Sequence, residues 1–119
     1  MKPDKINILG VEYKVVYYAK PSDVDLRGRE SRWGECDFWM RTIRVFDNGS
    51  RPEEDIWHTL IHESLHAIGE ALHLKILTDD ANHEQLDILA LALVDTFDRN
   101  GWMKSAMEKH DDVSAHRNG

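Results

Sequence analysis

The sequence predicts an α+β domain in which a small, mostly antiparallel twisted sheet packs on two main helices. Short runs rich in β-branched and aromatic residues occupy the first half of the chain. The second half instead carries two long segments with apolar residues at helical spacing. A chain of 119 residues is long enough for one core. We therefore assign residues 1–107 to a single domain and expect the polar residues 108–119 to form a flexible tail.

The first half of the chain contains four strand candidates. Gly10 permits a turn between the first two, and the fourth alternates cleanly, with Ile43 and Val45 facing one way and Arg44 the other. The polar residues 21–31 are typical of a loop. The predicted strands are residues 6–9, 13–18, 33–37 and 42–46.

The first long helix is predicted from about residue 52 to residue 72 or 74. Ser50 and Glu53 have the spacing of a capping box, in which the side chain of each residue accepts a hydrogen bond from the backbone N–H of the other. The acidic run Glu53-Glu54-Asp55 complements the positive end of a helix dipole. These signals place the helix start just before the most informative motif of the chain.

The second long helix is predicted over residues 80–99. Thr78 or Asp79 is a suitable N-cap, and Asn100-Gly101 suits a left-handed ending. Leu86 and its neighbours form one apolar face, but Ile88 is apolar on the other side. We therefore expect this helix to be buried nearly all round.

Charge and composition narrow the functional classes. The net charge of -7 argues against general binding to nucleic-acid phosphates or to anionic membranes. A single cysteine, Cys36, cannot form an internal disulfide, which fits a reducing compartment. The N-terminus lacks an apolar secretory segment, and no apolar run is long enough to span a bilayer. We expect a cytoplasmic protein.

The first helix carries the pattern H-E-x-x-H as His62-Glu63-Ser64-Leu65-His66. Positions i and i+4 share one face of a helix, so His62 and His66 can present two imidazoles to one metal ion. Glu63 would then act as the base that activates the attacking water. The pattern predicts a zinc-dependent hydrolase, although such ligands accept several metals.

A catalytic zinc site needs a third protein ligand, which must come from elsewhere in the chain. Our first candidate is Glu84, near the start of the second helix, which a returning helix can bring beside the histidines. His83 is the rival and would give a three-histidine site. His73 is a further candidate, one residue later than the third histidine of the metzincin motif.

Residues 59–68 and the Glu-bearing helix after them resemble the gluzincin branch of the zincin metallopeptidases in its smallest form. The closest resemblance is to short phage and prophage predicted metallopeptidases related to the ImmA/IrrE family, and it covers about residues 6–102. It implies a twisted sheet on two helices with the metal between them. It also implies that strand 42–46 lines the substrate cleft, where an extended peptide pairs with its edge. Larger gluzincins carry Glu-x-x-x-Asp, in which the Asp is four residues after the Glu. Here Asp87 is only three residues after Glu84.

The resulting hypothesis is a zinc-dependent metallopeptidase that cleaves a narrow, regulatory protein substrate. Two alternatives stay open. The first is a metal-binding structural or interaction module without turnover, which would tend to fill the fourth metal position with a protein ligand. The second is an SprT-like protease acting on DNA-bound proteins, against which the acidic charge counts.

Overall fold

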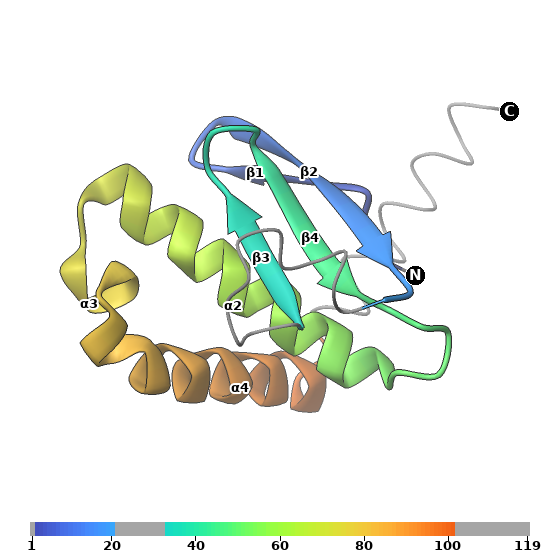
Figure 1. Ribbon diagram of the computed structural model, residues 1–119. Helices are drawn as coiled ribbons and strands as arrows, with labels where there is room; N and C mark the ends of the chain where they lie inside the picture. The colour runs from blue at the N-terminus through green and yellow to red at the C-terminus, as the bar shows by residue number, and fades with distance from the viewer. Residues whose placement is uncertain (1, 21–32, 102–119) are drawn as a thin grey trace, which may run out of the picture.

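The computed structural model describes residues 2–20 and 33–101, which form an α+β fold (Figure 1). All four predicted strands and both predicted long helices are present, with ends shifted by a few residues. The predictions for residues 21–31, 102–107 and 108–119 lie outside the described ranges. The elements are β1 Lys5–Ile8, β2 Val11–Tyr18, β3 Gly34–Asp37, β4 Thr42–Phe46, α2 Glu53–Leu72, α3 Lys75–Thr78, the 3-10 turn η1 Asp80–Asn82 and α4 His83–Arg99.

The sheet is mixed and has the strand order β1-β2-β4-β3. The outer pairings, β1 with β2 and β3 with β4, are antiparallel, but the central pairing of β2 with β4 is parallel. Strand β4 therefore has neighbours on both sides, and the expectation that a peptide pairs with its edge is wrong. Among the described strands, β1 and β3 each have a single neighbour, and β3 is the one of the two that packs more closely on α2. Alternation along β4 shows which residues face the core, but it does not distinguish an inner strand from an edge strand.

The core lies between the sheet and α2. Ile43 and Val45 are fully buried on the helix-facing side of β4, as their alternation predicts, and Leu60 meets them from α2. Gly34 brings β3 unusually close to α2, because a Cβ atom at Gly34 would lie 2.4 Å from the Thr59 Cγ2 atom and 3.2 Å from the Glu63 Cγ atom. This close approach sets β3 directly over the H-E-x-x-H turn.

Helix α4 packs on α2 from the side away from the sheet (Figure 1). Its buried residues are Leu86, Ala90 and Val94, whereas Ile88 is 60% exposed and Leu91 is 56% exposed. The expectation of burial nearly all round is therefore wrong, because α4 has one main neighbour and hence one buried stripe. No helix within the described ranges is both long and apolar enough to cross a membrane.

The helix ends differ from those that the sequence predicts. The N-cap of α2 is Pro52, which forms no side-chain cap hydrogen bond, rather than Ser50 as the predicted capping box requires; the Asn48 side chain accepts the Ser50 N–H. The left-handed residue that closes α2 is His73, with φ 54°. The chain then turns through α3 and η1 before α4 begins at His83, later than the predicted start at residue 80.

Candidate metal centre

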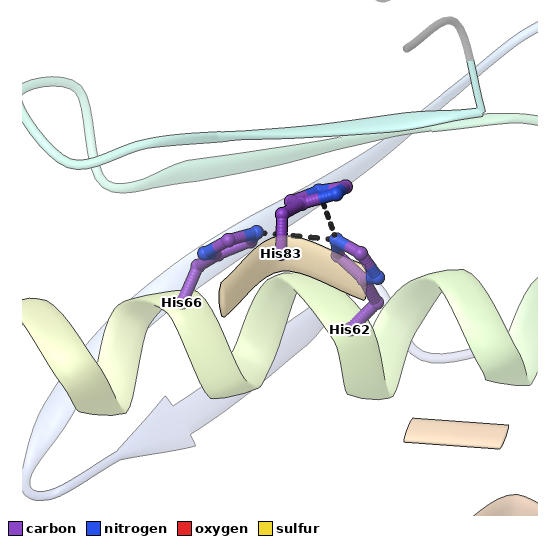
Figure 2. Close-up of side chains that lie close together, drawn as sticks. All are labelled: His62, His66 and His83. Atoms are coloured by element: carbon purple, nitrogen blue, oxygen red, sulfur yellow. Dashed lines mark hydrogen bonds between the residues drawn. The ribbon is translucent and has the colours of Figure 1, made fainter. Parts of the chain in front are cut away.

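Helix α2 holds His62 and His66 on one face, as the i, i+4 spacing predicts. Their Nε2 atoms lie 3.1 Å apart (Figure 2). His62 is 8% exposed and His66 is partly buried, since this face of α2 lies beneath β3 and against the returning chain. The first two ligands of the predicted site are therefore adjacent and preorganised.

His83, the first residue of α4, completes the group. Its Nε2 atom lies 3.1 Å from the Nε2 atom of His62, and its ring stacks on that of His66 with centroids 5.5 Å apart (Figure 2). The ligand atoms of the three histidines all lie within 4.8 Å of one another. Within the described residues, neither Glu84 nor His73 belongs to such a group, although Glu84 lines the adjoining cleft. The structure thus places the rival third ligand, His83, beside the pair.

The outer nitrogens of two rings are held by hydrogen bonds. Nδ1 of His62 donates to Asp87 Oδ1 at 2.8 Å, and Nδ1 of His66 donates to the Leu77 carbonyl oxygen at 3.0 Å. A carbonyl or a carboxylate only accepts, so each neutral ring carries its proton on Nδ1. The lone pairs of both Nε2 atoms therefore face each other. Such outer contacts fix the tautomer and the orientation of metal-binding histidines.

The facing nitrogens fit a metal ion. Two Nε2 lone pairs at 3.1 Å with no proton between them repel, and a cation between them removes that repulsion. Zinc binds imidazole nitrogens at about 2.0–2.1 Å, and tetrahedral geometry then separates them by about 3.3–3.4 Å. Burial, the largest cause, lowers the pKa of His62 to about 4, although its hydrogen bond to Asp87 acts in the opposite direction. His62 is therefore neutral at pH 7, the form that binds a metal.

Glu63 is buried next to the histidines. One of its carboxylate oxygens, Oε2, lies 3.9 Å from Nε2 of His62. The side chain is covered by β3 at Gly34, whose close approach leaves it little room to rotate away. A carboxylate at this distance is within reach of a water molecule bound next to the histidine nitrogens.

A cleft of about 620 Å³ adjoins the group and is lined by His62, Glu63 and His83. Trp33 and Gly34, at the start of β3, line one side, and His83 and Glu84, on the first turn of α4, line the other. The cleft is thus bounded by the end strand of the sheet and by the second helix, with the H-E-x-x-H turn between them.

Sequence reasoning gave Asp87 no firm role, yet its carboxylate orients His62. The spacing His83-x-x-x-Asp87 places a candidate ligand and the carboxylate that contacts His62 four residues apart on one helix. That spacing was a signal for His83. The Leu77 carbonyl could not be found in this way, because a backbone group has no sequence signature.

No protein-family model, curated protein or solved structure matches the chain. The function is therefore argued from the geometry of the cleft and its histidines.

Proposed function

We propose that the protein is a zinc-dependent metallopeptidase whose ion is held by His62, His66 and His83. The observation that carries the proposal is the convergence of three imidazole nitrogens, two of them with the proton fixed on the far side of the ring. A bound zinc ion supplies Lewis-acid chemistry and makes water nucleophilic at neutral pH. Three protein ligands leave a position open, as in catalytic rather than structural zinc sites.

Glu63 acts as the general base in this proposal. It takes the proton of the attacking water and passes it to the leaving amine when the peptide bond breaks. Its position supports this role, because the buried carboxylate lies 3.9 Å from Nε2 of His62. Asp87 and the Leu77 carbonyl hold His62 and His66 in position.

The substrate in this proposal is an extended peptide that pairs with β3. The Phe46 N–H donates to the Trp33 carbonyl oxygen at 2.8 Å, which makes these two residues a hydrogen-bonded pair. By the alternation of antiparallel strands, the backbone groups of Gly34 and Cys36 then point away from β4. A peptide added there would run past Gly34 and hence past Glu63.

The proposal is tested with full-length protein purified without added metal. We expect about one zinc ion per chain, with His62→Ala losing the ion. Glu63→Gln should retain the ion and lose hydrolysis of a random heptapeptide mixture, read by mass spectrometry, by at least ~100-fold. Glu70→Gln, an exposed change on the same helix, is the matched control and should retain both properties.

Two results would contradict the proposal. A metal-free protein would remove the zinc site itself. A stoichiometric ion without any peptide hydrolysis would instead identify a metal-binding structural module, and undiminished hydrolysis by Glu63→Gln would remove the base.

A further inference from the structure

A second group of ligand atoms lies on the opposite side of His62. His58 precedes His62 by one turn of α2, and its Nε2 atom lies 3.0 Å from Asp87 Oδ1. The same carboxylate oxygen lies 2.8 Å from Nδ1 of His62. The three ligand atoms are all within 4.8 Å of one another. This group shares His62 with the three-histidine group but uses its other ring nitrogen.

We propose that His58, Asp87 and Nδ1 of His62 form a second, weaker site for a divalent transition-metal ion such as Zn²⁺. Two imidazoles and one carboxylate make a ligand set that zinc readily accepts. The present separations of 2.8 and 3.0 Å are slightly shorter than the ~3.3 Å between ligands of a tetrahedral ion, so a small outward movement admits one.

Access and rigidity separate the two sites. The side chain of Asp87 is 50% exposed and that of His58 is 24% exposed, so an ion reaches them from the solvent. The three-histidine group is instead anchored on buried His62 and on His66, whose far nitrogen the Leu77 carbonyl holds. An ion at the second site should therefore bind and dissociate faster. This site also keeps an open coordination position toward the cleft, which His58 and Asp87 help to line.

The shared ring makes the two sites compete. When the second ion binds, it replaces the proton on Nδ1 of His62, which leaves to solvent, and it takes over the carboxylate of Asp87. Two divalent ions on opposite nitrogens of one ring also repel each other, which makes the second ion at least ~100-fold weaker than the first. If the proposed peptidase function holds, an ion in this place also obstructs the cleft, so zinc beyond one equivalent inhibits hydrolysis.

The test is a calorimetric titration of the metal-free, full-length protein with zinc chloride. We expect one tight and one weaker ion per chain. His58→Gln should lose the weaker ion and keep the tight one, whereas His66→Ala should lose the tight ion and keep the weaker one. If His58→Gln does not fold, as judged by circular dichroism, His58→Ala replaces it.

Control variants cover the remaining histidines. His73→Asn suits the left-handed backbone of that residue, and His110→Asn/His116→Asn removes the two histidines beyond the described residues. Both should still bind two ions. A single tight ion that His66→Ala abolishes and His58→Gln does not change would overturn the second site and leave the proposed function standing. A second ion lost only in the His110/His116 variant would also overturn it. No zinc binding at all would remove both proposals.

Discussion

The two helices that supply the histidines differ in how they are held. Helix α2 is fixed on two sides, by the sheet through Gly34 and by the chain that returns past Leu77. Helix α4 packs chiefly on α2 and leaves a broad apolar side exposed. The buried His62 belongs to the first environment and the exposed His83 to the second.

This difference indicates that the two helices would contribute differently to one metal site. In the proposed site, α2 would provide a preformed pair of ligands and the base, at positions that the core determines. Helix α4 would provide the third ligand from its first residue, and because this helix has one main neighbour, a small rotation of it costs little free energy. Metal binding should therefore depend on both halves, whereas stability should depend mainly on their mutual contact.

Replacing His83, the proposed third ligand, tests the contribution of α4 to the site most directly. Structural zinc sites in zinc-finger peptides bind with about 10–16 kcal/mol over four ligands, so loss of one ligand is expected to cost about 10²–10³-fold in affinity. We expect this loss for His83→Ala and almost none for Glu84→Ala, measured by competition with a zinc-binding dye. A large loss for Glu84→Ala and almost none for His83→Ala would identify Glu84 as the ligand and contradict the role given to His83.

The contrast within α4 is tested with two leucines. Leu86 is buried against α2 and Leu91 is 56% exposed. Leu86→Ala should lower the free energy of unfolding by about 2–5 kcal/mol, and Leu91→Ala by less than ~0.5 kcal/mol. Urea unfolding of both variants measures the difference. Equal losses would mean that something covers the outer side of α4.

Acidification probes the buried side of the site in the metal-free protein. The pKa of His62 is lowered from its ordinary value of 6.5 to about 4. The unfolded chain therefore binds a proton that the folded protein does not, and stability is full above pH 6.5 and falls as the pH falls toward 4. The expected loss is about 3 kcal/mol, read from urea unfolding in the presence of a chelator. His62→Gln should flatten this dependence; an unchanged slope would assign it to other groups.

Gly69→Ala probes the contact between α2 and the returning chain. The new Cβ atom would lie 2.6 Å from the Leu77 Cβ atom and so push Leu77 outward. Because the Leu77 carbonyl orients His66, we expect zinc affinity to fall by about 10-fold. Glu70→Ala, an exposed change at the next residue, is the control. Unchanged affinity in Gly69→Ala would show that His66 needs no outer contact.

The sequence predicted the parts of this molecule that depend on local patterns. The alternation of Ile43 and Val45 identified the core side of β4, and the i, i+4 spacing identified the face shared by His62 and His66. It did not predict that β4 lies inside the sheet, because an inner strand and a half-buried edge strand have the same alternation. Nor did the apolar residues on both sides of α4 show that this helix packs against only one main element.

The choice between His83 and Glu84 shows why a site is harder to predict than a helix. Successive residues of a helix point about 100° apart around its axis, so an error of one residue selects a different face. The sequence did not reveal α3 and η1, which set where α4 begins and hence which of His83 and Glu84 faces His62. The four-residue spacing between His83 and Asp87 held that information, because Asp87 must reach His62 from the same helix.

The parallel pairing of β2 with β4 has a consequence for the order of folding. Val16 pairs with Arg44, 28 residues away, whereas the three histidines lie within the 22 residues from His62 to His83. Pairings distant in sequence form slowly, because the intervening loop must close before they contribute any stability. We expect the helical hairpin to gather its histidines early, so that zinc is captured there before completion of the sheet, which limits the overall rate.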